Sequence, residues 1–145
     1  MERREVLGLL GATSAGLLAM NFGEAQAAEE KLVENPHAEC IRACQDCATK
    51  CADTCHHCMS KVSAGEKQYA KAMQLMADCE AFCRLSASMI ARMSPLMVYS
   101  CLACADACRD CAKECGQFDS PRLKECAERC RACEKSCRDM VKAMA

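Results

Sequence analysis

The sequence predicts an all-α protein, an antiparallel up-down-up-down four-helix bundle with a cysteine-lined core. Three observations support this prediction. Seventeen cysteines lie in 145 residues, and most are spaced three or four residues apart, which is the period of an α-helix. Helix-start and helix-stop signals divide the chain after residue 34 into four segments. The connections between these segments are short, so that consecutive helices run antiparallel.

The first two helices are marked by polar residues at their expected starts. Asn35-Pro36 has the form of an N-cap followed by proline at the first helical position, which predicts a helix to about residue 61. Ser63 and Glu66 have the spacing of a capping box, which predicts the start of a second helix. We expect this second helix to run to about Met93.

Proline and glycine mark the remaining helices. Ser94-Pro95 predicts the end of the second helix and the start of the third. Gly116 is a typical stop signal for the third helix. Ser120-Pro121 predicts the start of the fourth, which continues nearly to the C-terminus.

The N-terminal 27 residues have the features of an export signal peptide, which leaves residues 28–145 as the cysteine-rich domain. Arg3-Arg4 precede a weakly apolar stretch, and Ala25-Gln26-Ala27 has the form of a signal-peptidase site. The stretch is shorter than the roughly 20 apolar residues that a membrane span needs. Paired arginines indicate a twin-arginine signal and a periplasmic protein, with an ordinary secretory signal as the alternative.

Composition excludes some partners. The chain has 19 basic and 20 acidic residues, so there is no electrostatic case for binding nucleic acid or, after signal removal, a membrane. Tryptophan is absent and aromatic residues make up 3% of the chain. A conventional apolar core would therefore be weak, and other interactions must contribute to stability.

The cysteines occupy the stripe that a bundle helix normally gives to leucine and isoleucine. The six between residues 40 and 58 fall within an arc of about 80° on a helix. An odd number of cysteines leaves at least one thiol unpaired. Helical neighbours at these spacings also lie about 5–6 Å apart, too far for an unstrained disulfide. This geometry does not exclude disulfides between helices, so a disulfide-bonded structural or redox-buffering protein is an alternative.

Metal binding is the stronger interpretation, and charge favours Cu(I). Soft thiolates select Cu(I), Zn(II) or iron–sulfur clusters. Zinc and iron–sulfur sites close with four ligands and would use few of these residues. If each thiolate bridges two Cu(I) ions and each ion takes two thiolates, the core is neutral. Several buried zinc tetrathiolates would each carry a charge of −2. General sequestration of Cu, Zn or Cd, as in a metallothionein, is the alternative.

Three features of the sequence resemble the bacterial copper storage proteins. They are the leader, the segment Asn35-Pro36-His37 before the first cysteine, and the in-helix ladders of Cys-x-x-x-Cys and Cys-x-x-Cys. The resemblance implies a bundle that stores many Cu(I) ions for cuproenzymes, exchanges them with copper donor and acceptor proteins, and forms a homotetramer. It also implies Cu(I) ligation by Cys40, Cys44, Cys47, Cys51, Cys55, Cys58, Cys79, Cys83, Cys101, Cys104, Cys108, Cys111, Cys115, Cys126, Cys130, Cys133 and Cys137.

The antiparallel order predicts two different ends. Copper uptake in the family uses an open end with methionine and histidine, and thiols reach closer to the end that contains residues 56–59. We therefore expect the copper mouth there, with His57, Met59, Met73 and Met76 as candidate ligands. Apolar residues are expected to close the opposite end, because methionine at helical spacing is more often core than ligand.

No catalytic machinery is evident in the sequence. Nothing resembles a nucleophile–base pair or a phosphate-binding loop. The Cys-x-x-Cys spacing occurs in redox enzymes, but that motif expects a βαβ setting, which the helical pattern does not offer. We therefore expect a protein that is not an enzyme.

Overall fold

The computed structural model describes residues 34–144, so the predicted signal peptide lies outside the described residues. This part of the chain contains four long helices and one short 3₁₀ helix: α1 (Ala38–Ser63), η1 (Lys67–Tyr69), α2 (Ala70–Ala91), α3 (Met97–Cys115) and α4 (Pro121–Ala143). Over the same residues there is no β-strand. None of these helices is long and apolar enough to cross a membrane.

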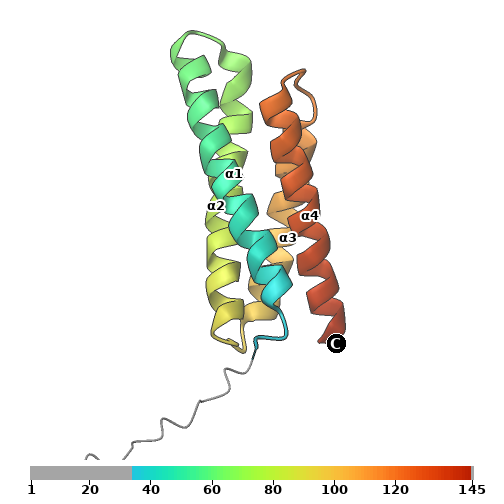
Figure 1. Cartoon of the computed structure of the whole chain (residues 1–145). Coiled ribbons are helices and arrows are strands. Elements are labelled where there is room, and N and C mark those ends of the chain that lie inside the picture. Colours follow the sequence, from blue (N-terminus) through green and yellow to red (C-terminus); the bar gives the residue numbers. More distant parts are fainter. Residues whose placement is uncertain (1–33, 145) are drawn as a thin grey trace, which may run out of the picture. The chain divides into compact units, whose positions relative to one another are not determined.

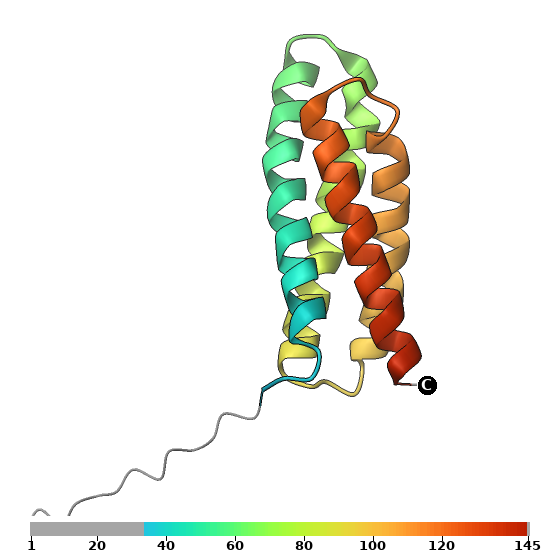
Figure 2. The same cartoon turned by 45° about the vertical axis from the view of Figure 1, so that its right-hand side comes forward.

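The helices form the predicted up-down-up-down bundle (Figures 1 and 2). In the described chain α1 contacts α2 and α4, and α3 contacts the same two helices, whereas the diagonal pairs make no close backbone contact. The connections from α1 to α2 and from α3 to α4 lie at one end, and the connection from α2 to α3 lies at the other. The predicted fold class is confirmed.

The first helix begins later than predicted. Asn35 is not its N-cap, because α1 starts at Ala38 and His37 is the capping residue. The Asn35 side-chain oxygen instead accepts a hydrogen bond from the His37 amide at 2.8 Å, which forms a turn before the helix. Asn35 Nδ2 also donates to the Ile90 carbonyl at 3.0 Å, so this turn is held against the end of α2.

The predicted capping box at Ser63 is wrong. Ser63 is the last residue of α1, and Gly65 follows with a φ of 93°. The Gly65 and Glu66 amides donate to the Val62 and Lys61 carbonyls, which is the hydrogen-bond pattern of a Schellman motif. The Glu66 carboxylate lies 3.0 Å from Lys61 Nζ and caps no helix. The glycine signal therefore ends α1, and α2 starts only after η1.

The second helix ends in the same way, but without glycine. α2 stops at Ala91, and Met93 follows with a φ of 51°. The Met93 and Ser94 amides donate to the Ile90 and Met89 carbonyls, again as in a Schellman motif. The predicted end of the helix at Met93 was therefore slightly too late.

Predictions at the remaining helix ends were mixed. α3 begins at Met97, two residues after Pro95, so Ser94 is not its cap. The predicted stop at Gly116 is confirmed, because this glycine is the C-cap of α3. The start of α4 is also confirmed, with Ser120 at the N-cap and Pro121 at the first helical position.

Cysteine side chains fill most of the core. Every cysteine is buried except Cys55, which is partly buried. Alanines complete the packing between the thiols, and the largest fully buried side chains are Met76, Ile90 and Leu123. The thiol stripes of the four helices thus face a common axis, as the spacing predicted.

Candidate metal centre

The thiols of different helices are in van der Waals contact across the bundle axis. Cys79 and Cys108 Sγ lie 3.5 Å apart, and Cys83 and Cys104 Sγ lie 3.6 Å apart. A disulfide would require about 2.05 Å between the sulfurs. All seventeen thiols are free in the structure, in accordance with the metal-binding interpretation.

The cysteines of α2 and α3 are in register. Cys79 on α2 is opposite Cys108 on α3. Four residues later on α2, Cys83 is opposite Cys104, which precedes Cys108 by four residues on α3. Antiparallel helices continue such a register. One further step therefore pairs Ser86 with Cys101, and one step in the other direction pairs Met76 with Cys111.

Helices α1 and α4 show the same kind of register. The Sγ–Sγ distances are 3.8 Å for Cys40 with Cys137, 3.7 Å for Cys44 with Cys133 and for Cys47 with Cys130, and 3.8 Å for Cys51 with Cys126. Each pair follows the previous one by one helical turn. The two registers together divide the core into layers, each with one residue from each helix.

Four layers follow one another along the axis. The first contains Cys40, Ser86, Cys101 and Cys137, the second Cys44, Cys83, Cys104 and Cys133, the third Cys47, Cys79, Cys108 and Cys130, and the fourth Cys51, Met76, Cys111 and Cys126. The two central layers are thus all thiol. In each outer layer α2 supplies a different side chain, a hydroxyl at one end and a thioether at the other.

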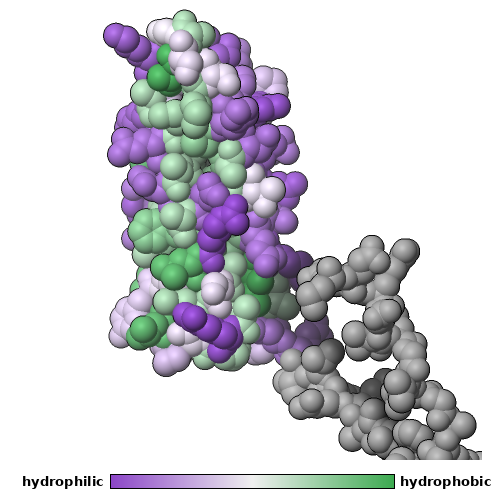
Figure 3. Space-filling model, turned by 90° about the vertical axis from the view of Figure 1, so that its left-hand side faces the viewer, coloured by the Kyte–Doolittle hydropathy of each residue, from purple (hydrophilic) through white to green (hydrophobic). Residues whose placement is uncertain are grey.

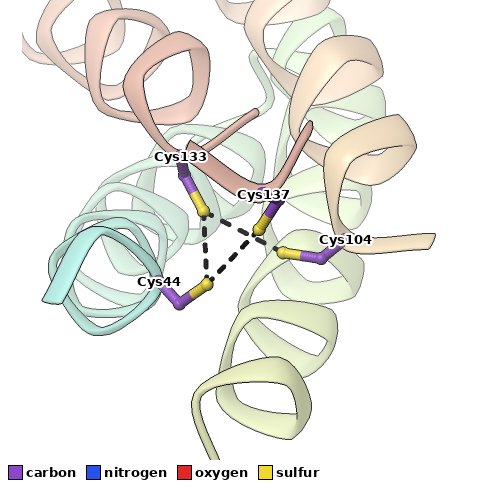
Figure 4. A group of neighbouring side chains, drawn as sticks. All are labelled: Cys44, Cys104, Cys133 and Cys137. Carbon is purple, nitrogen blue, oxygen red and sulfur yellow. Dashed lines mark hydrogen bonds between the residues drawn. The ribbon is translucent and has the colours of Figure 1, made fainter. Parts of the chain in front are cut away.

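Neighbouring layers also touch, which gives continuous clusters of thiols. Cys44, Cys104, Cys133 and Cys137 lie with all their sulfurs within 4.8 Å of one another (Figure 4). They come from α1, α3 and α4, and their side chains point toward one another. Another such group, Cys47, Cys83, Cys108 and Cys133, takes one residue from each of the four helices. These spacings allow thiolates to bridge metal ions along the axis.

Burial affects the protonation of the thiols. Desolvation, followed by the charge of Cys55, raises the pKa of Cys58 from 9.0 to about 11. Contacts with Cys104 and three other thiols, together with burial, raise the pKa of Cys108 above its ordinary value. Because metals bind the thiolate, each such thiol must lose its proton when a metal binds.

Three cysteines lie outside the compact groups. Within residues 34–144, Cys55, Cys58 and Cys115 belong to none of the sets whose sulfurs all lie within 4.8 Å. The Cys55 thiol donates to the Met73 carbonyl at 3.5 Å, and Cys115 Sγ is 3.8 Å from Cys111 Sγ. These residues are at the end of the bundle where α1 ends and α4 begins.

The candidate mouth residues lie in different environments. Met76 is fully buried in the fourth layer, and Met73 is partly buried against the core. Met59 is 51% exposed. The His57 ring lies edge-on to Tyr69, with 6.4 Å between the centroids. The four side chains thus differ in exposure, and their role as ligands stays a prediction.

An aromatic pair links the two connections at this end of the bundle. The rings of Tyr69, in η1, and Phe118, in the connection from α3 to α4, stack with 4.8 Å between centroids. Both residues pack against the core.

At the opposite end of the bundle, a hollow of about 520 Å³ lies between the start of α1 and the last turns of α4. Its lining includes His37, Cys40 and Met140.

Sequence reasoning missed the buried hydroxyls. Thr54 and Ser86 are fully buried, and Ser100 is nearly so. Thr54 and Ser100 donate to carbonyls of their own helices, at 2.8 and 2.9 Å. Ser86 follows Cys79 by seven residues, so that helical geometry puts both on nearly the same face. This spacing was the signal that could have identified Ser86 as a core residue.

Layered free thiols along the axis of a four-helix bundle define a helical thiolate metal-binding protein. The family model described as copper storage protein matches residues 26–142, and the chain belongs to this family. The uncharacterized cysteine-rich protein YhjQ of Bacillus subtilis (strain 168) is 34% identical over 90 residues, which are 61% of this chain and 80% of that protein.

Solved structures with the same fold include copper-loaded proteins. The structure of the Cu(I)-bound copper storage protein BsCsp3 matches with a TM-score of 0.68 and 31% identity, over 72% of this chain and 98% of that chain. The copper storage protein Ccsp from Streptomyces lividans, loaded with 10 copper equivalents, matches with a TM-score of 0.67 and 27% identity, over 73% and 83% of the two chains.

Proposed function

We propose that this chain stores many Cu(I) ions on the thiolates of its core, supplies them to cuproenzymes and limits free copper. The layered packing of sixteen buried thiols and one partly buried thiol around a single axis carries this conclusion. Family membership and the copper-loaded relatives support it. Storage requires no turnover, and we infer that the protein is not an enzyme.

The packing also supports selectivity for Cu(I). In the described residues the buried sulfurs of the central layers contact other sulfurs, and no lysine or arginine is buried beside them. A core of this kind tolerates neutral copper thiolates. It does not compensate the net charge of −2 that a zinc tetrathiolate would bring. General sequestration of Zn or Cd is accordingly disfavoured.

Anaerobic titration of the reduced protein with Cu(I), against a competing chelator, tests this proposal. We expect tight uptake of roughly one ion per thiol, since each thiolate can bridge two ions. A parallel titration with Zn(II) should show fewer and weaker sites. Saturation at about four Cu(I) ions, or equal tightness for zinc, would instead support general metal sequestration.

We further propose that the protein is exported to the periplasm by the twin-arginine route. The Arg3-Arg4 pair supports this, and the family match begins at residue 26, beside the expected cleavage after Ala27. Replacing both arginines with lysine should retain the uncleaved chain inside the cell. Unchanged export of that variant would indicate an ordinary secretory signal.

We also propose that the chain forms a homo-oligomer, which is a tetramer by family resemblance. Apolar residues gather on the lower half of the side of the bundle where α2 lies (Figure 3). Phe82 and Leu85 on α2, with Tyr99 and Leu102 on α3, are 38–70% exposed. Light scattering of the F82E/L85E variant tests this surface. We expect smaller particles with unchanged helix content, and an unchanged mass would exclude the surface as an interface.

The route of copper into the core can be tested at both ends. The sequence favours the end with His57 and Met59, whereas the hollow beside Cys40 offers a second route at the opposite end. Uptake rates of H57A/M59A and H37A/M140A should separate them, because only the variant at the mouth should load slowly. Final copper capacity should be unchanged in both.

A further inference from the structure

The first layer differs from the other thiol layers. Its three sulfurs, from Cys40, Cys101 and Cys137, lie within 4.8 Å of one another, and in the described chain this is the one such set with exactly three members. The other sets each take four cysteines from two neighbouring layers, and the set with Cys44, Cys104 and Cys133 also includes Cys137. In the fourth layer, which also has three cysteines, Met76 supplies a sulfur from α2. The first layer is therefore a three-thiol group, with α2 contributing no sulfur.

A hydroxyl takes the place of the missing thiol. Ser86 is opposite Cys101 in the register of α2 and α3, and it is fully buried. Among the residues that the structure describes, its Oγ is the one buried side-chain oxygen or nitrogen without a hydrogen-bond partner. A hard oxygen is a poor ligand for Cu(I). The fourth corner of this layer is thus polar and carries no soft donor.

One thiol of the group, that of Cys40, borders a hollow at the surface, whereas Cys101 and Cys137 are fully buried. Cys40 is 3% exposed and lines the hollow between the start of α1 and the last turns of α4, together with Ser136 and Met140. The hollow is large enough for a small neutral solute. The thiols of the central layers do not line it.

We propose that Cys40, Cys101 and Cys137 form a binding site for a trivalent thiophilic oxoacid of the arsenite and antimonite class. A trivalent ion on three thiolates is neutral, whereas Zn(II) there would leave a charge of −1 and a single Cu(I) a charge of −2. The lone pair of As(III) occupies the fourth corner of its pyramid. A thiol fills that corner in the central layers, and Ser86 takes the corresponding place in the first layer.

The reaction is a ligand exchange without electron transfer. Arsenous acid, As(OH)₃, reacts with the three thiols to give As(SCys)₃ and three water molecules. Each As–O bond is replaced by an As–S bond, and each thiol proton leaves with a hydroxyl group as water. The inference does not depend on copper storage, because it concerns another ligand and one layer only.

Titration of the reduced full chain with arsenite under anaerobic conditions tests the proposal. We expect the first equivalent to bind with three sulfurs around arsenic, measured by X-ray absorption, and the intact mass to show one arsenic per chain. The C101S variant should weaken binding of this equivalent by at least about tenfold. The matched control is C115S, on the same helix and outside all the compact groups, and it should bind as the wild type does.

Other outcomes would overturn the site. If C101S binds the first equivalent of arsenite as tightly as the wild type does, arsenic binds elsewhere. Equal losses of arsenite affinity in C101S and C115S would lead to the same conclusion. Fewer than three sulfurs around arsenic would also contradict it. If C101S loses helix content, C40S provides the same test on α1. Cu(I) capacity measured on the same samples reports on copper storage separately.

Discussion

At the scale of single residues, α2 distinguishes the layers of the core. Cys79 and Cys83 complete the two central layers, while Met76 and Ser86 stand in the outer ones. Met76 offers a soft thioether to the fourth layer, whereas Ser86 brings a hydroxyl without a partner. The helical period of the cysteines predicted that they face the core. The role of Ser86 depends on the register between α2 and α3, which the spacing within one helix does not give.

The unpartnered hydroxyl leads to a stability prediction. We expect S86A to raise the free energy of unfolding of the reduced, copper-free protein by about 1 kcal/mol, because a buried polar group without a hydrogen bond is costly. Urea unfolding followed by circular dichroism measures this. S100A is the control, since Ser100 Oγ donates to the Met97 carbonyl at 2.9 Å and its loss should bring no gain. A destabilised S86A would show that the hydroxyl has a favourable contact.

At the scale of the helices, the C-terminal ends of α1 and α2 have similar geometry but differ in the residue that adopts a positive φ. Gly65 and Met93 each follow a helix with positive φ and the same hydrogen-bond pattern. Glycine adopts this conformation freely, whereas methionine there is strained. The sequence showed the glycine but suggested a capping box at Ser63. Ser94-Pro95 indicated the end of the second helix near Met93, but the sequence did not indicate the positive φ of Met93, because methionine is not a turn residue.

This difference can be tested by exchanging the residue types. We expect M93G to raise the free energy of unfolding by up to about 1 kcal/mol, because glycine removes the strain of the left-handed conformation and the Met93 side chain is half exposed. G65A should lower it by a similar amount, although nothing lies within 4 Å of the position of the added Cβ. Destabilisation of M93G would mean that the side-chain contacts of Met93 outweigh its backbone strain.

At the scale of the whole molecule, the thiol core makes copper-free stability dependent on pH. The pKa of Cys58 is raised from 9.0 to about 11 in the folded protein, so folding favours the protonated thiol. Its contribution is present in full below about pH 9 and is lost as the pH rises through about 11. We expect the Tm of the reduced protein to fall across this window. C58S should show a smaller fall, and a Tm independent of pH would contradict the burial of this thiol.

The bundle as a whole was predictable from the sequence, because cysteine spacing, Gly116 and Ser120-Pro121 each indicate helices and their limits. The layers were not, since they arise from the relative shift of antiparallel helices. The position of the mouth stays a prediction: Met76 lies in the core, and a hollow forms beside Cys40 between α1 and α4.

The positions of copper in crystals of the fully loaded protein test the central claim most directly. Anomalous diffraction at the copper edge locates each ion without assumptions about its ligands. We predict a row of copper peaks along the bundle axis, from the layer of Cys40 to that of Cys51 and on toward Cys115, each beside two or three sulfurs. Peaks confined to the surface, or a single site with the central layers empty, would contradict the account.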